Sequence, residues 1–255
     1  MTTRPLILCI GGEKSNIGKT TLGAAFIRSL VAPSSPDDTL VLLKPPKRFG
    51  AIKYTKTAFY ASITDDPHLI EQPDKDTAEY RAAGAERVLW VQAPPEQLQE
   101  LMPQAMDMLS DLDIIMVEGN SPIEFLRPDG VICIVSSGAA SGKPSARKAL
   151  QIADLLVSIS AEQPLNMSPA IFSVTLSDLS SGAGADGVHR LIRRMDDILI
   201  KKKIAALLTE RAENGRISCT AARAVAEEIG ISYALIGAAA DELKIKVKQC
   251  ELGCF

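Results

Sequence analysis

The first thirty residues restrict the fold of this chain more than any later stretch. An apolar run, Leu6 to Ile10, ends in two glycines, and the stretch from Lys19 to Leu30 then carries apolar residues at helical spacing. This order predicts a strand, a glycine-rich loop and a helix. A buried strand that leads directly into a helix favours a parallel sheet covered by helices.

The next part of the chain continues the alternation of strand and helix. Further strands are predicted at residues 39–43, 88–91, 114–117, 131–135 and 155–159, and helices at 96–110 and 144–153. Residues 48–73 have no clear periodicity and are predicted to form a long functional loop. We therefore expect an α/β fold with a doubly wound, mostly parallel sheet.

The pattern changes near residue 188. A lysine-rich helical run at 198–204 precedes two amphipathic segments that meet at Gly230, a residue suited to ending a helix. We predict a first domain over residues 1–190 and a small helical module over residues 198–255. The module has the outline of a helix-turn-helix.

Charge and hydropathy argue against nucleic-acid binding and against membrane insertion. The 28 Lys and Arg residues are balanced by 31 Asp and Glu, so no overall basic field attracts nucleic acid or an anionic membrane. The second helix of the module, 232–243, carries two acids and no cation, which makes nucleic acid an unfavoured partner. The apolar runs are too short to span a bilayer and no leader pattern is present, so we expect a cytoplasmic protein.

Residues 12–20 read Gly-Glu-Lys-Ser-Asn-Ile-Gly-Lys-Thr and lie between the first strand and helix. There the glycines let backbone amides turn toward one point, and the helix N-terminus adds positive potential. Lys19 is predicted to meet the β- and γ-phosphates of a nucleotide, and the Thr20 hydroxyl to bind Mg²⁺. The fold is thus predicted to be a P-loop NTPase domain. Its predicted nucleotide-binding residues are Gly12, Lys14, Ser15, Asn16, Ile17, Gly18, Lys19, Thr20 and Thr21.

Acids and lysines farther along complete the predicted site. Glu118 ends an apolar strand, at the sheet edge where α/β proteins bind ligands, and is predicted to hold Mg²⁺ or orient a nucleophile. With Lys19 it forms the candidate catalytic pair. Asp76 either joins the metal shell or caps a helix. Lys44 and Lys53 lie after the second predicted strand and are expected to meet phosphate or an acidic substrate.

The phosphate loop resembles those of two known groups. It has five residues between Gly12 and Gly18, as in the dethiobiotin synthetase and cobyrinic acid amidase group. Lys14 lies five residues before Lys19, where deviant Walker A proteins carry a signature lysine. Ser15 and Asn16 replace the paired glycines that normally follow, so a role for Lys14 across a homodimer stays open.

The order of four features resembles the adaptor family of molybdopterin-guanine dinucleotide biosynthesis. These features are Gly18-Lys19-Thr20, the lysine-rich segment 44–56, Lys75-Asp76-Thr77 with Ala83-Gly84-Ala85, and Val117-Glu118-Gly119. The segment 53–56 departs from that family, which is usually His-rich there. The resemblance implies a homodimer that slowly hydrolyses ATP or GTP during molybdenum cofactor assembly, with a pterin cofactor and a cofactor-assembly enzyme as partners.

Two other functions remain open from the sequence. The dethiobiotin synthetase likeness allows an ATP-dependent ligase that acts on a carboxylate or carbamate. The helical module allows a nucleotide-sensing regulator that binds DNA or a partner protein.

The five cysteines fall into two sets. Cys9 and Cys133 lie inside predicted strands and are expected in the core. Cys219, Cys250 and Cys254 lie in the helical module, where three thiolates allow part of a metal or iron–sulfur shell. The simpler interpretation, which we favour, is that these three are buried or tolerated thiols.

Overall fold

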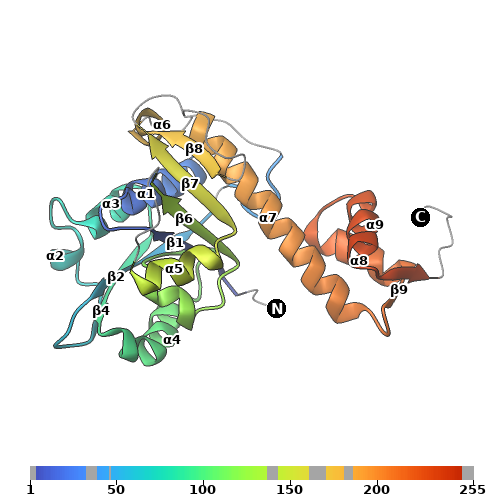
Figure 1. Ribbon diagram of the computed structural model, residues 1–255, viewed down its shortest axis with the longest axis horizontal. Helices are drawn as coiled ribbons and strands as arrows, with labels where there is room; N and C mark the ends of the chain where they lie inside the picture. The colour runs from blue at the N-terminus through green and yellow to red at the C-terminus, as the bar shows by residue number, and fades with distance from the viewer. Residues whose placement is uncertain are drawn as a thin grey trace. The chain divides into compact units, whose positions relative to one another are not determined.

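The computed structural model describes residues 4–32, 39–45, 47–136, 143–160, 171–180 and 186–248. The chain divides into two compact units, shown in Figure 1. The first unit comprises Met1–Asp37 and Pro45–Ile192, and the second comprises Asp38–Lys44 and Arg193–Phe255. The division falls inside one helix, and the short segment Asp38–Lys44 joins the second unit, which the sequence analysis did not predict.

The first unit is built on an eight-stranded sheet in the order β3-β4-β2-β5-β1-β6-β7-β8. Within the described residues every neighbouring pair is parallel except β3 with β4. The strands are β1 Leu6–Gly12, β2 Phe49–Lys56, β3 Ser62–Thr64, β4 Arg87–Ala93, β5 Ile114–Glu118, β6 Gly130–Val135, β7 Leu155–Ser160 and β8 Ile171–Thr175.

Helices cover both faces of this sheet (Figure 1). They are α1 Lys19–Val31, α2 Pro67–Ile70, α3 Asp76–Ala82, α4 Leu98–Met108, α5 Pro144–Gln151 and α6 Leu176–Ser180, with 3-10 turns η1 Pro95–Gln97 and η2 Ser121–Phe125. Helices α1 and α3 contact each other, whereas α4 and α5 pack on the opposite face around Cys9, Val117 and Cys133. The predicted α/β, doubly wound, mostly parallel fold is confirmed.

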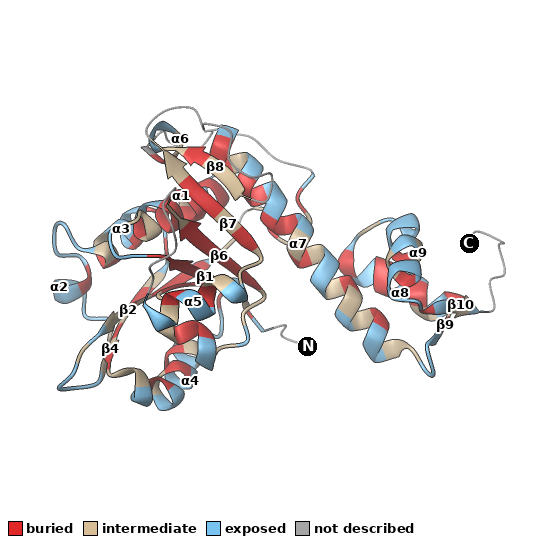
Figure 2. Cartoon of the chain, viewed as in Figure 1, coloured by how far each residue is buried: buried red, intermediate tan, exposed pale blue. Residues whose placement is uncertain are grey.

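The core is made mainly of aliphatic strand residues. Figure 2 shows the central strands buried along most of their length. Cys9 and Cys133 are both fully buried, as predicted, and burial raises the pKa of the Cys133 thiol to about 12. Buried thiols that stay protonated behave as small apolar groups, so both cysteines serve packing.

The prediction of a strand at residues 39–43 is wrong. Residues 41–43 form bends in the second unit, and Asp196 accepts hydrogen bonds from the backbone N–H groups of all three. The second strand along the chain is β2, inside the stretch predicted to be a loop, because its lysines and threonine hid the apolar pattern.

The second unit is a small helical module. It contains the C-terminal part of α7 Asp186–Arg211, α8 Cys219–Ile229 and α9 Tyr233–Glu242, with the short parallel strands β9 Arg216–Ser218 and β10 Lys246–Lys248. Gly230, at φ +82°, ends α8, and its N–H donates to Ala226 O. The core of the unit includes Leu208, Val225 and Ile236.

Neither the metal or iron–sulfur shell that the module's cysteines allow nor the favoured interpretation as buried or tolerated thiols can be judged for all three residues. Cys219 is buried at the start of α8, whereas Cys250 and Cys254 lie outside the described residues. Among the helices that the structure describes, none has the length and apolar character needed to cross a membrane.

Candidate functional site

The glycine-rich loop links β1 to α1 through two residues in the left-handed region. Asn16 has φ 54° and Gly18, the residue before α1, has φ 95°. A Cβ atom on Gly18 would lie 2.8 Å from Ile159 Cδ1, and one on Gly12 would lie 2.8 Å from Ile17 Cγ2. Gly18 therefore suits glycine both by its backbone conformation and by its packing, whereas a side chain at Gly12 would have to displace Ile17.

The start of the loop is held by hydrogen bonds to two residues, Asn120 and Ser136, that follow the neighbouring strands β5 and β6. The Gly12 N–H donates to Asn120 Oδ1 at 2.9 Å, and Asn120 Nδ2 donates to Gly12 O at 2.8 Å. Glu13 accepts hydrogen bonds from the Ser136 N–H and hydroxyl, and these bonds lower the pKa of Glu13. These residues were not predicted, although Asn120 follows the predicted Glu118-Gly119 directly.

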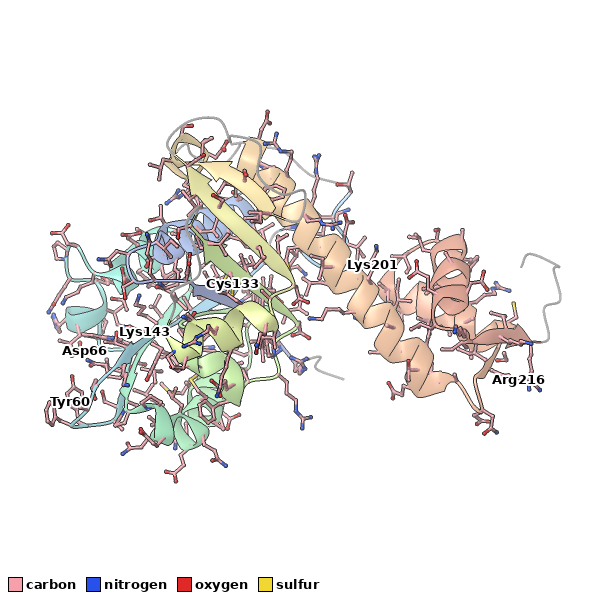
Figure 3. The ribbon with its side chains drawn as sticks, in the orientation of Figure 1. Tyr60, Asp66, Cys133, Lys143, Lys201 and Arg216 are labelled. Carbon is pink, nitrogen blue, oxygen red and sulfur yellow. The ribbon has the colours of Figure 1, made fainter. Side chains whose placement is uncertain are left out.

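Lys19 occupies the mouth of the loop. Its ammonium donates to Lys14 O at 3.2 Å, and burial lowers the pKa of Lys19 while the charge of Glu118 opposes that shift. Lys143, just before α5 and labelled in Figure 3, also lowers the pKa of Lys19 through its charge. An anion bound at the loop would counter the lowering of the Lys19 pKa by burial and by Lys143.

Glu118, at the end of β5, is the centre of the polar cluster behind the loop. Its side chain is 2% exposed. The Thr20 hydroxyl donates to Glu118 Oε2 at 2.9 Å, and the Tyr80 hydroxyl donates to the same oxygen at 3.0 Å. Lys53 Nζ donates to the other oxygen, Oε1, at 2.6 Å. Tyr80 was not predicted, because its pattern is that of an ordinary core residue of a helix.

Lys53 connects two carboxylates. Besides Glu118, its ammonium forms an ion pair with Asp76, the first residue of α3. Burial by itself lowers the pKa of Lys53, but Glu118 and Asp76 outweigh burial and raise it. Burial likewise opposes ionisation of Asp76, yet the hydrogen bond and charge of Lys53 lower its pKa. Asp76 therefore faces the cluster rather than capping α3, whose N-cap is Lys75.

These residues line one cleft of about 490 Å³ in the first unit. The lining includes Ser15, Asn16, Gly18, Lys19, Thr20, Thr21, Lys53, Tyr54, Thr55, Lys56, Asp76, Glu79, Glu118 and Gly119. Burial and the charges of Asp76 and Glu118 raise the pKa of Glu79. Most of the predicted site residues are thus brought together, although Lys14 is an exposed loop residue whose backbone carbonyl meets Lys19.

Lys44 was predicted at this edge because it follows the presumed strand 39–43. That reason no longer holds, since the segment is not a strand and Lys44 belongs to the second unit. The strand β2, rather than residues 39–43, reaches the cleft, and it contributes Lys53.

The oxygen ligands of the cluster suit a hard cation. Among the described residues no three His, Cys, Asp or Glu side chains are placed to hold a metal by themselves. Three oxygen-bearing side chains nevertheless lie together. The carboxylates of Asp76 and Glu118 both contact the Lys53 ammonium, and the Thr20 hydroxyl donates to Glu118. Mg²⁺ typically takes one or two carboxylates and completes its shell with water and substrate phosphates, so this set fits it.

Comparisons with known proteins give distant likenesses only. No family model matches this chain. No curated protein sequence matches it either. A plasmid partition protein from Borrelia burgdorferi is similar over 78% of this chain and 100% of its own, with 12% identity and a TM-score of 0.39.

Two further solved structures are similar at the same level. LpxK from Aquifex aeolicus, in complex with ATP, covers 89% of this chain and 69% of its own, with 14% identity and a TM-score of 0.41. A putative plasmid partition protein from Borrelia burgdorferi B31, bound to AMPPNP, covers 78% and 100%, with 12% identity and a TM-score of 0.38. Because all three TM-scores lie below 0.5, these likenesses assign neither a family nor an activity to the chain.

Proposed function

We propose that this chain binds a nucleoside triphosphate together with Mg²⁺ in the cleft and hydrolyses it slowly. The observation that supports this most is the 2.9 Å hydrogen bond between Thr20 and the buried Glu118. Thr20 is the second residue of the helix that follows the glycine loop, and Glu118 ends the neighbouring strand β5. In phosphoryl-transfer proteins a hydroxyl and an acid so placed hold Mg²⁺ beside the phosphates.

The loop would supply the phosphate contacts. The loop between Gly12 and Gly18 contains two residues in the left-handed region, Asn16 and Gly18, and α1 begins directly afterwards, so the helix N-terminus adjoins the loop. Lys19 is half-buried, and within the part of the chain that the structure describes no carboxylate is hydrogen-bonded to it, so phosphate oxygens would stabilise its charge. Lys19 would thereby hold the β- and γ-phosphates.

Thr20, Glu118 and Asp76 would hold the metal. Bound Mg²⁺ supplies charge neutralisation at the phosphoryl group being transferred. Glu118 would hold this ion through Oε1 or through water, because Oε2 already accepts two hydroxyl groups. The Thr20 hydroxyl donates a hydrogen bond to Glu118, which leaves the lone pairs of the hydroxyl oxygen free for the cation.

The biological role that we propose is assistance in molybdenum cofactor assembly. It is supported by the four ordered motifs that resemble the adaptor family of molybdopterin-guanine dinucleotide biosynthesis, because each motif contributes residues to the cleft. These residues are Gly18 to Thr20, Lys53 to Lys56, Asp76, and Glu118 with Gly119. A pterin cofactor and a cofactor-assembly enzyme would then be the partners. Whether the nucleotide is ATP or GTP is left to the binding experiment.

A second candidate is an ATP-dependent ligase for a carboxylate or carbamate. It is favoured by the extension of the cleft along β2, where Lys53 and Thr55 lie beyond the phosphate loop. A second, anionic substrate fits the charge of that wall. Release of ADP that depends on such a substrate would favour the ligase, whereas slow basal hydrolysis with binding of a pterin cofactor would favour the assembly role.

Thermal unfolding of the full chain with ATP or GTP, with and without Mg²⁺, tests the proposal. A ligand at about one hundred times its Kd stabilises a protein by about 2.7 kcal/mol, which corresponds to a rise of about 5 °C in Tm. We expect this rise with at least one nucleotide plus Mg²⁺, and its loss in Lys19→Ala.

Lys148→Ala is the matched control. Lys148 is an exposed lysine that pairs with Glu124 on the surface, so the variant removes the same charge away from the cleft and should keep the full shift. Absence of any shift in the wild-type protein with both nucleotides would contradict the proposed function.

A further inference from the structure

The two oxygens of Glu118 have different kinds of partners. Oε2 accepts hydrogen bonds from two hydroxyl groups, those of Thr20 and Tyr80. Oε1 meets the ammonium of Lys53. A carboxylate with one oxygen held by fixed donors can exchange partners only at the other oxygen, so Oε1 is the exchangeable one.

Tyr80 reaches Glu118 through space left by a glycine. The Tyr80 side chain, on α3, is fully buried, and a Cβ atom on Gly23 of α1 would lie 2.7 Å from the Tyr80 hydroxyl. Burial and the charge of Glu118 raise the pKa of Tyr80 well above its ordinary value, so the phenol stays protonated and donates. The absence of a side chain at Gly23 thus permits the buried hydrogen bond between Tyr80 and Glu118.

Lys53 lies where a cation bound by both acids would lie. Its side chain is 15% exposed, and the one ammonium contacts carboxylate oxygens of Glu118 and Asp76. A divalent ion bound to Oε1 of Glu118 and to Asp76 needs the Oε1 oxygen that Lys53 contacts, and its charge repels the ammonium. Both cations cannot hold these positions together.

We propose that Tyr80 is a positioning residue that fixes Oε2 of Glu118, and that Lys53 is a built-in cation that a divalent metal must displace. This inference rests on the proposed function, because it concerns the same cleft. The two residues then influence metal affinity in opposite directions. Tyr80 favours metal binding by holding Glu118 in place, and Lys53 opposes it by competing for the same oxygens.

The test is a titration of the full chain with Mn²⁺ as a probe for Mg²⁺, without nucleotide, in which free Mn²⁺ is measured by electron paramagnetic resonance. Tyr80→Phe removes a hydrogen bond to a buried charge, and we expect about tenfold weaker Mn²⁺ binding. Lys53→Met removes the competing ammonium, and we expect about tenfold tighter binding. In thermal unfolding Mn²⁺ should raise the Tm of Lys53→Met more than that of the wild type.

Two control variants match these substitutions. The Tyr233 hydroxyl of the second unit also donates to a carboxylate, Glu227 Oε1, at 2.9 Å but does not line the cleft, so Tyr233→Phe should change Mn²⁺ affinity less than twofold. Lys148 is an exposed lysine that pairs with Glu124 and does not line the cleft, and Lys148→Met should also stay within twofold of wild type. If Tyr80→Phe does not fold, Gly23→Ala replaces it, because the added methyl group displaces the Tyr80 hydroxyl and should weaken Mn²⁺ binding similarly.

The outcomes separate this inference from the proposed function. Shifts of Tyr80→Phe and Lys53→Met in the same direction, or both within twofold of wild type, overturn the inference. Lack of Mn²⁺ binding by a wild-type protein that binds nucleotide also overturns it and leaves the proposed function intact. A wild type that binds no nucleotide at all, with or without metal, contradicts the proposed function itself.

Discussion

Two buried carboxylates, one in each unit, have the same exposure and different surroundings. Glu118 of the first unit and Asp196 of the second are each 2% exposed. Glu118 is held by side chains of α1, α3 and β2. Asp196 accepts the backbone N–H groups of Val41, Leu42 and Leu43 at 2.7, 2.9 and 2.7 Å.

The difference lies in what the partners can do. Backbone N–H groups cannot leave Asp196 unless the segment moves, so this carboxylate fastens 41–43 to α7 and serves stability. The ammonium of Lys53 can rotate away from Glu118, and Glu118 borders an open cleft. Burial alone therefore does not identify a functional acid, whereas exchangeable side-chain partners beside a cleft do.

The largest effect is expected for Asp196→Ala, which tests the structural half of this comparison. The variant leaves three backbone N–H groups without their acceptor, and each unsatisfied buried group costs about 1–3 kcal/mol. We expect a loss of about 4 kcal/mol in the free energy of unfolding, measured by urea denaturation followed by circular dichroism. Asp196→Asn keeps one acceptor oxygen and should lose less. A loss below about 1 kcal/mol for Asp196→Ala would show that the segment is held by other contacts.

Glu118→Gln tests the functional half. The amide oxygen can still accept from Thr20 and Tyr80, and Lys53 keeps Asp76, so the expected loss of stability is only about 1–2 kcal/mol. The Mg²⁺-dependent part of nucleotide affinity should fall about tenfold or more, as isothermal titration calorimetry with and without Mg²⁺ would measure. Asp196→Asn should leave that part unchanged. Equal Mg²⁺ dependence in Glu118→Gln and wild type would contradict the comparison.

Gly18→Ala separates backbone strain from binding. At φ 95° a side chain costs about 1–2 kcal/mol, and here the Cβ atom also meets Ile159. We expect this loss in urea denaturation together with loss of the nucleotide-induced Tm shift. Gly215→Ala is the matched control, because Gly215 has φ 69° with no atom within 4 Å of the added Cβ. It should lose about 1 kcal/mol and keep the shift.

The smallest effect concerns acid. The pKa of Asp76 is lowered from its ordinary value of 3.8 in the folded protein, so the unfolded chain takes up this proton first as pH falls. The resulting stabilisation is full above about pH 5 and is lost as pH falls through 3.8 and below. Because the Asp76 side chain is 45% exposed, we expect only about 0.5 kcal/mol.

Urea denaturation between pH 6 and pH 2.5 measures this loss. Asp76→Asn should have a flatter stability curve than wild type, whereas Asp74→Asn, a change at an exposed neighbour, should keep the wild-type slope. Identical slopes for all three proteins would mean that Lys53 does not stabilise the Asp76 carboxylate.

The sequence predicted the structure correctly where residues next to one another in the chain determine it. The strand, loop and helix from Leu6 to Val31 were predicted because glycines, apolar spacing and Lys19-Thr20 lie next to one another. The acid at the end of β5 was predicted for the same reason. The prediction failed at 39–43, because an apolar run of that length can enter a sheet or pack on a helix, and Asp196 decides between them from more than 150 residues away.

From its consecutive residues alone, this chain determines an α/β sheet with a left-handed glycine turn before α1, since backbone φ and ψ depend on local sterics. Only the tertiary structure decides which donors surround Glu118. Tyr80, Lys53 and Thr20 lie 38, 65 and 98 residues from it along the chain. They meet because α3, β2 and α1 converge at one edge of the sheet. Such a meeting depends on packing between distant elements, and no local spacing in the sequence records it.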